Sequence, residues 1–345
     1  MKTLLITLVS LINLNIMAKK PVAMVVITRG EISILRPRTL KAIPLTNGMS
    51  LSEDSSILSG EKSFARIKFS DGSILNIGPE SKLVVKIHKP NGKTLLSLLK
   101  GRIRATVNKS KKGAPNKFFI KTKTAALGVR GTDFQTTFDP ASGRTSLLTY
   151  EGSVAIKKVR PSFEKRVDSF SDEDKINFVQ KTLEKEDQLA EVGDFTNVDP
   201  VAKKATATVK VSAQQLVLLE RDSTMGVDKV KFKKAAFSKA VKEKNGLIKQ
   251  NAEKRGLKLD EKNLGLIDTK TGLYIPKKDG KAVGRISGNG QYLAPRGLTL
   301  DSRKGFISTT KEGQEKAKSL NEELLIDQVS DESVNPAYLR YFKSN

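Results

Sequence analysis

Apolar and polar residues alternate with a period near two from Ala23 to about Lys158, in short runs separated by Gly, Pro, Asn and Asp. This period predicts β-strands with one buried face. The expected strands are Val25–Thr28, Glu31–Leu35, Ser63–Phe69, Ile74–Ile77, Lys82–Ile87, Thr94–Leu99, Ile103–Val107, Lys117–Thr122, Asp133–Phe138, Thr145–Tyr150 and Ser153–Lys158. Turns such as Asp71-Gly72 separate them, a pair that readily takes the positive φ of a tight hairpin. The first half of the chain is therefore predicted to be all-β.

A glycine followed by alternating apolar residues recurs at 30–34, 101–105 and 152–156. Each such glycine is expected to turn the chain into a new strand whose alternate side chains face inward. This recurrence favours a β-solenoid or a rolled sheet over an open α/β sheet. The glycines predicted to serve structural turns are Gly72, Gly78, Gly101, Gly128, Gly131 and Gly152.

The pattern changes after Arg160, and the second half is predicted to be smaller, less regular and α+β. Residues 159–207 form an acidic segment and a linker, in which Ser171 is expected to start a helix before apolar residues at helical spacing. In the basic region 208–345, residues 229–255 predict an amphipathic helix that packs on its own domain, with a membrane surface as the alternative.

Two segments of the C-terminal region, 267–273 and 300–306, repeat one pattern at an offset of 33 residues. Each places a turn that begins with Asp and ends with Gly between apolar residues, so β-hairpins are expected. A calcium loop is the alternative, but basic residues inside both turns disfavour it. From Thr310 a single helix is predicted, ending near Ser330.

The N-terminus has the order of a secretory signal peptide, predicted over residues 1–18. Lys2 precedes the apolar stretch Leu4–Met17, and the small residue Ala18 follows it. These ~14 residues would span ~21 Å as a helix, less than the ~30 Å hydrocarbon core, which favours cleavage after Ala18, with Ala23 second. No transmembrane segment is expected after cleavage, and the chain is predicted to be periplasmic or secreted. An uncleaved anchor is the alternative.

Composition excludes several kinds of chemistry. The chain of 345 residues has no cysteine and a single histidine, His88, so thiolate metal clusters, disulfides and multi-histidine sites are excluded. No phosphate loop, nucleophile elbow or cofactor fingerprint occurs. Glu80 and Glu151 could serve as an acid and base pair, although solvated surface positions are expected. The sequence predicts no enzyme, with no catalytic, metal or cofactor-binding residues and no cofactor.

Positive charge is concentrated in the β-rich half. Lys19 to Lys158 holds 26 basic and 9 acidic residues, within a chain whose formal charge is +25. Lys100, Arg102 and Arg104 alternate along one predicted strand, which places them on one face as a basic strip. An anionic envelope polymer or an envelope protein is the expected partner, and a solvated face is the alternative. Nucleic acid is not expected, because only 6% of residues are aromatic and none is Trp.

The strongest local signal is Ile120–Phe138 (IKTKTAALGVRGTDFQTTF), in which Arg130 lies between Gly128 and Gly131 in a turn of small residues. This segment resembles the most distinctive stretch of FecR-type domains. Residues 72–81 and 98–104 resemble two earlier blocks of that family, and 149–156 resembles its last block. Four blocks in order across about 100 residues make the resemblance specific, and the predicted domain is 23–158.

The resemblance implies an all-β extracytoplasmic module that binds a protein or an envelope polymer. In iron-signalling members this module lies beyond a membrane helix, a cytoplasmic segment controls a sigma factor, and the periplasmic part contacts a receptor. Because the apolar stretch starts at residue 4, no cytoplasmic anti-sigma segment is expected. Lys100, Arg102, Arg104 and Arg130 are the predicted contacts, although Arg130 fits a purely structural turn equally well. The alternative is a periplasmic component that relays receptor occupancy to a separate transmembrane regulator.

Overall fold

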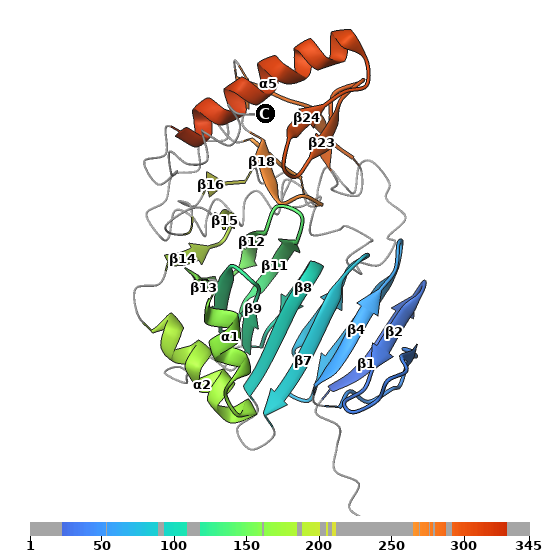
Figure 1. The fold of residues 1–345 in the computed structure, drawn as a ribbon. Helices are drawn as coiled ribbons and strands as arrows, with labels where there is room; N and C mark the ends of the chain where they lie inside the picture. Colours follow the sequence, from blue (N-terminus) through green and yellow to red (C-terminus); the bar gives the residue numbers. More distant parts are fainter. Residues whose placement is uncertain are drawn as a thin grey trace, which may run out of the picture.

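A computed structural model describes most of the chain. It covers residues 23–52, 54–88, 93–108, 118–160, 162–184, 188–200, 205, 209–211, 265–268, 270–275, 277–278, 280–287 and 292–329. Most of these residues form a 16-stranded sheet with two helices packed on it, and a smaller hairpin-rich part with one longer helix lies toward the C-terminus (Figure 1). The prediction of a mostly β N-terminal domain followed by a small C-terminal region is confirmed.

The 16 strands form two layers that share the strand β8 (Lys93–Thr106). The first layer has the order β1 (Ala23–Arg29), β5 (Phe64–Phe69), β6 (Ile74–Ile77), the second part of β8, β11 (Asp133–Asp139), β12 (Arg144–Glu151), β15 (Asp194–Val198) and β16 (Val209–Lys210). The second layer has the order β3 (Ile43–Pro44), β2 (Ile32–Leu35), β4 (Ser55–Ser59), β7 (Lys82–His88), the first part of β8, β9 (Phe118–Lys121), β10 (Ala125–Val129), β13 (Ser153–Lys158) and β14 (Gln188–Glu191). The predicted solenoid or rolled sheet is not confirmed, since the pairings of the described strands include no closed ring.

Glycines mark the points where the chain crosses between the layers. Gly30, Gly101, Gly131 and Gly152 lie at such crossings with φ of 76°, 87°, 64° and 75°. At Gly101 an added Cβ would lie 2.3 Å from the Ser81 Oγ and 2.6 Å from the Ser81 Cα. The crossing therefore needs both the left-handed conformation and the missing side chain. Gly101 thus allows β8 to pass from one layer to the other, although it does not begin a new strand as the sequence pattern predicts.

The other predicted turn glycines differ from one another. Gly72 has φ 82° in the hairpin between β5 and β6, and Gly78 lies in the connection from β6 to β7. The prediction for Gly128 is wrong, because this residue pairs with Phe119 and Ala155 in the middle of β10. The sequence around it suggested a turn because small residues on both sides hide the strand's alternation.

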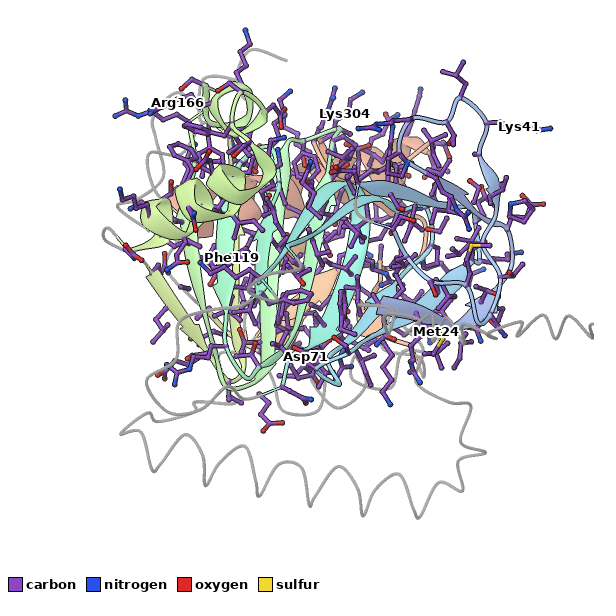
Figure 2. The ribbon with its side chains drawn as sticks, turned by 90° about the horizontal axis from the view of Figure 1, so that it is seen from below. Met24, Lys41, Asp71, Phe119, Arg166 and Lys304 are labelled. Carbon is purple, nitrogen blue, oxygen red and sulfur yellow. The ribbon has the colours of Figure 1, made fainter. Side chains whose placement is uncertain are left out.

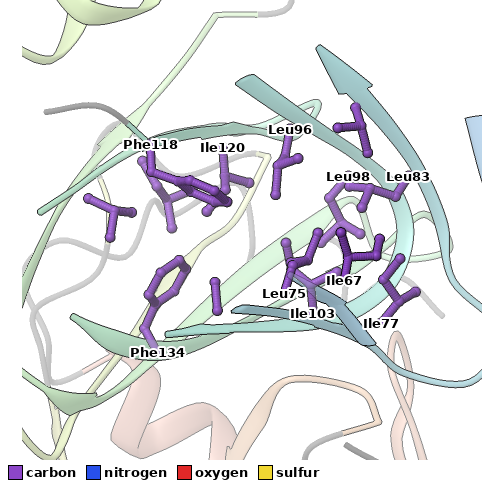
Figure 3. Close-up of a cluster of buried hydrophobic side chains, with 14 of the residues drawn as sticks. Ile67, Leu75, Ile77, Leu83, Leu96, Leu98, Ile103, Phe118, Ile120 and Phe134 are labelled. Carbon is purple, nitrogen blue, oxygen red and sulfur yellow. The ribbon is translucent and has the colours of Figure 1, made fainter. Parts of the chain in front are cut away.

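The main core fills the space between the two layers (Figure 3). Its members are apolar side chains from alternate positions of the strands, as a period of two requires. Those contributed by the first layer include Ile67, Leu75, Ile77, Ile103 and Phe134, and those contributed by the second include Leu83, Leu96, Leu98, Phe118 and Ile120. Because each of these ten side chains is at most 3% exposed, the two layers form one structural unit.

Two helices cover part of the outer face of the second layer. α1 (Ser162–Asp168) and α2 (Asp172–Leu183) pack Val167, Ile176 and Val179 against outward side chains of β8, β9 and β10. The Ser171 Oγ accepts a hydrogen bond from the Asp174 backbone N–H, so the predicted start of this helix is confirmed.

In the C-terminal part, the residues that the structure describes form four small hairpins and the helix α5 (Lys311–Val329). The hairpins are β17–β18 (Leu266–Asp268, Leu273–Ile275), β19–β20 (Lys277–Lys278, Lys281–Ala282), β21–β22 (Arg285–Ile286, Tyr292–Leu293) and β23–β24 (Thr299–Asp301, Gly305–Ile307). The repeated Asp-to-Gly turns join β17 to β18 and β23 to β24, so the two predicted hairpins are confirmed, as is the terminal helix.

Other predictions fall outside the part of the chain that the structure describes. These are the signal peptide 1–18 and the amphipathic helix 229–255. Within the described ranges, no helix combines the length and the apolar character that crossing a membrane requires.

Candidate functional site

The four predicted contact residues do not form one strip. Lys100 lies at the corner where β8 passes from one layer to the other, and its side chain is 52% exposed. Its Nζ lies 3.8 Å from the Glu80 Oε1, an exposed pair that contributes little stability. Lys100 therefore keeps the accessibility that a contact residue needs.

Arg104 is buried, which corrects its placement on an exposed basic strip. Its Nε and Nη2 donate hydrogen bonds of 2.8 and 2.6 Å to the two carboxylate oxygens of Asp133. The guanidinium also lies 4.0 Å from the centre of the Tyr150 ring. Since the arginine side chain is only 7% exposed, these contacts hold the first layer together.

Arg102 and Arg130 lie at different ends of the same strand pairing. β11 runs antiparallel to β8 and places Gly101 opposite Phe138 and Thr106 opposite Asp133. Arg130 is exposed in the turn just before β11, so it lies at the Thr106 end, whereas Arg102 lies next to the corner. The two ends are separated by five residues of strand, or about 17 Å. Arg130 therefore cannot extend a strip that starts at Lys100.

A different surface stays open around Lys100. Among the described residues, α1 and α2 lie to one side of the second layer and reach as far as β7, and no helix lies on the outer face of β2 and β4 (Figure 1). We call this surface the open face and define it by Leu35, Leu58, Lys82, Val84 and Lys100.

Strand register aligns the open face. Leu58 lies opposite Lys82, and Lys82 lies opposite Lys100, in one row across three strands. Leu58 is 52% exposed and Leu35 is 37% exposed. The result is a flat surface on which exposed leucines adjoin two ammonium groups. The sequence contained the signal for Lys82, an outward position in an alternating strand, but not the information that the face would stay uncovered.

The opposite side of the sandwich meets the C-terminal hairpins. The Ser146 Oγ of β12 donates a hydrogen bond of 3.1 Å to the Gly272 carbonyl oxygen. Asp268 is buried at this junction, and desolvation raises the pKa of its carboxyl, while hydrogen bonds from Thr271 and the charge of Arg102 act in the opposite direction. A narrow hollow between Gln135, Phe195, Ile267 and neighbouring residues remains at the junction. Arg102 is therefore close to the C-terminal part and only half-exposed.

A second junction joins the β11–β12 turn to the turn of β23–β24. Arg144 donates to the Ser302 carbonyl oxygen at 3.4 Å, and the Arg303 Nε donates to the Ala141 carbonyl oxygen. Burial of Asp139 would raise the pKa of its carboxyl, but hydrogen bonds from Ser142, Ser302 and the local backbone outweigh it and lower that pKa. This side of the first layer is an internal contact rather than a free surface.

The described residues hold no group of three or more His, Asp or Glu side chains that could bind a metal. The Glu80 and Glu151 carboxylates lie in different places, since Glu80 faces Lys100 and Glu151 ends β12 opposite Asp133. The open face combines exposed apolar side chains with positive charge.

Comparison with known proteins finds two similar solved structures and a family match to one part of the chain. The chain is similar to two crystal structures, at 2.50 and 1.65 Å resolution, of a "putative anti-sigma factor" from Parabacteroides distasonis ATCC 8503. Each is 11% identical with a TM-score of 0.35, over 48% of this chain and 64% of that one, so the chain spans less than two thirds of their length. No curated protein matches the sequence. The family model described as "FecR protein" matches residues 55–155, from the start of β4 into β13, and this range overlaps all four sequence blocks. Residues 55–155 are therefore a FecR domain.

Proposed function

We propose that this chain is an exported, non-enzymatic binding protein of the cell envelope. Its FecR domain binds a protein partner or an anionic envelope polymer through the open face. The observation that carries the proposal is the exposure of Leu58, Lys82 and Lys100 in one row, on the face that α1 and α2 leave uncovered. Contiguous exposed apolar surface beside positive charge favours recognition of an anionic partner.

Export places the protein in the periplasm or outside the cell, where the FecR domain would operate. The signal-like order of residues 1–18 supports this location. Cleavage after Ala18 leaves β1 complete, whereas cleavage after Ala23 would remove a buried residue that pairs with Phe69. Mass analysis of the N-terminus of protein recovered from the envelope fraction is expected to give Lys19 as the first residue.

The binding test is a charge reversal on the open face. We expect the double variant Lys82→Glu/Lys100→Glu to lose retention in the envelope fraction while its thermal unfolding stays unchanged, because both side chains are exposed. The matched control is Lys304→Glu, an exposed lysine in a C-terminal turn. Unchanged fractionation of the double variant, or an equal loss in the control, would contradict the use of this face.

A photo-crosslinking residue at Leu58 identifies the partner. A crosslinked envelope protein indicates a protein partner, and a crosslinked glycan or phosphate-rich polymer indicates the polymer. The same residue at Leu127, which is buried in β10, serves as the control that should give no product.

Signal relay to a separate transmembrane regulator is the second candidate function, and the FecR domain at 55–155 supports it. It makes a distinct prediction for the crosslinking experiment. A membrane-embedded regulator should appear among the products, and its yield should change when the corresponding receptor is occupied.

A further inference from the structure

The connection between β2 and β3 carries the most exposed apolar residue of the described chain. Leu40 has a relative exposure of 105%, so nothing covers its side chain. Arg36, Arg38 and Lys41 around it are also exposed, and Lys41 lies at the periphery of the molecule (Figure 2). We call residues 36–41 the basic loop. No acidic residue occurs between positions 32 and 52.

The backbone of the basic loop contains a strained turn. The Thr39 N–H donates a hydrogen bond of 3.2 Å to the Arg36 carbonyl oxygen, and the Thr39 Oγ1 donates another of 2.8 Å to the same atom. Pro37 fixes a negative φ at the first central position, and Arg38 has a φ of 59° at the second, which is the pattern of a type II turn. Glycine is the residue that this second position favours. An arginine at this position costs backbone stability, and it places a cation on the exposed turn.

Two further exposed leucines lie on the same layer as the basic loop. Leu35 ends β2 immediately before the loop, and Leu58 lies on the neighbouring strand β4. Both point away from the core of the second layer, since the residues between which they alternate are buried. Met24 and Val26 are also exposed, but they lie on the outer face of the first layer, and Figure 2 shows Met24 on the other side of the molecule from Lys41. Leu35 is therefore the apolar residue that adjoins the loop along the chain.

We propose that the basic loop docks the protein on the surface of an anionic phospholipid bilayer. Leu40 enters the boundary between headgroups and acyl chains, where an aliphatic side chain leaves water. Arg36, Arg38 and Lys41 contact the lipid phosphates around it, since a guanidinium group binds two phosphate oxygens at once and an ammonium group binds phosphate as a point charge.

The arrangement fits a lipid surface by charge and shape. Three cations flank one projecting leucine and have no acidic neighbour in the loop, so the loop complements a negatively charged plane. A leucine that projects completely can reach into such a plane without a shaped pocket on the other side. The proposal goes beyond the proposed function, because it uses residues outside the FecR domain match and a different partner.

The test is vesicle flotation of the mature chain from Lys19 to Asn345. Vesicles of equal phosphatidylglycerol and phosphatidylcholine are expected to bind the protein, and vesicles of phosphatidylcholine alone are not. Replacing Arg36, Arg38 and Lys41 together by serine should weaken binding about 100-fold, at about fivefold for each charge near an anionic surface. Leu40→Ser should weaken it about tenfold. The matched controls Leu189→Ser, an exposed leucine of β14, and Lys304→Ser should leave vesicle binding within about twofold of the parent.

One variant separates binding from folding. Arg38→Gly relieves the positive φ, so its melting temperature should stay equal to or above that of the parent while vesicle affinity falls about fivefold. The proposal is overturned if the protein does not float, if both vesicle types bind equally, or if the loop variants bind like the parent. Loop variants that lose a crosslinked protein but keep vesicle binding would assign the loop to a protein partner instead. The Lys82→Glu/Lys100→Glu variant should still float, so failure of the open face and failure of the loop are distinguishable.

Discussion

Replacing Gly101 by alanine is expected to destabilise the protein far more than an ordinary substitution in a turn. The φ of 87° at this residue lies in the left-handed region, where a residue with a side chain destabilises the folded state by about 1 kcal/mol relative to glycine. The added methyl would lie 2.3 Å from the Ser81 Oγ and 2.6 Å from the Ser81 Cα, and the second atom belongs to the backbone and cannot rotate away. Overpacking of this kind contributes about 1–3 kcal/mol more.

The same methyl would disturb a hydrogen bond. The Ser81 Oγ accepts from the Arg102 backbone N–H at 3.0 Å, and moving Ser81 to make room lengthens that contact. Its loss adds about 1 kcal/mol. The expected destabilisation is therefore about 3–5 kcal/mol, a large fraction of the roughly 5–15 kcal/mol that stabilises a typical domain.

Gly48 provides the matched control. Its φ is 81°, and an added Cβ would have nothing within 4 Å, so Gly48→Ala isolates the backbone effect at about 1 kcal/mol. Urea unfolding followed by far-ultraviolet circular dichroism measures both variants, since the chain has no Trp for fluorescence. Equal losses in the two variants, or a loss below about 1 kcal/mol for Gly101→Ala, would refute the close approach at the crossing between layers.

Four other substitutions test separate contacts. Arg104→Ala should lower the free energy of unfolding by about 3 kcal/mol, because it leaves the Asp133 carboxylate largely buried without this arginine. Lys100→Ala should change the free energy of unfolding by less than about 0.5 kcal/mol, because its ion pair is exposed. Urea unfolding that ranks the two variants in the other order contradicts the structure. Asp268 has a folded-state pKa raised above 3.8, so the native state holds more protons than the unfolded chain above that value, and stability should fall as pH rises through the raised pKa. Asp268→Asn should make stability less dependent on pH and should stabilise the C-terminal hairpins at pH 7. Hydrogen exchange of the hairpin amides as a function of pH measures this effect, and the same profile in parent and variant would contradict a raised pKa at Asp268. Ser171→Ala should destabilise α2 by about 1 kcal/mol through the lost cap, measured by thermal unfolding, and an unchanged melting temperature would exclude that capping role.

Most strands of the sandwich could be predicted from the sequence, because one face of each is buried and the other is polar. β10 was missed because all five of its residues, Ala125–Val129, are buried, so no alternation remains to be seen. β8 was predicted as two strands because Gly101 interrupts it, whereas the structure continues the strand through the corner. The alternation of apolar and polar residues identifies a strand. It does not show whether the strand continues through a glycine because a neighbouring strand keeps pairing with it.

The predicted site was harder to obtain for a similar reason. Alternation along β8 correctly suggests that Arg102 and Arg104 point the same way, but it contains no information about what covers that face. Arg104 is buried against Asp133 and Tyr150, and Arg102 lies near a hairpin more than 160 residues later in the chain. The positions of Arg130 and Lys82 depend on strand register, which arises from the packing of distant segments.

Because β8 belongs to both layers, neither layer can shear against the other without tearing that strand. Lys100 on the open face and Arg102 beside the C-terminal hairpins are separated along it only by Gly101. A force applied at one of these sites would thus pass to the other through a single extended segment of backbone. The two layers should therefore move together as one rigid body when either site is pulled.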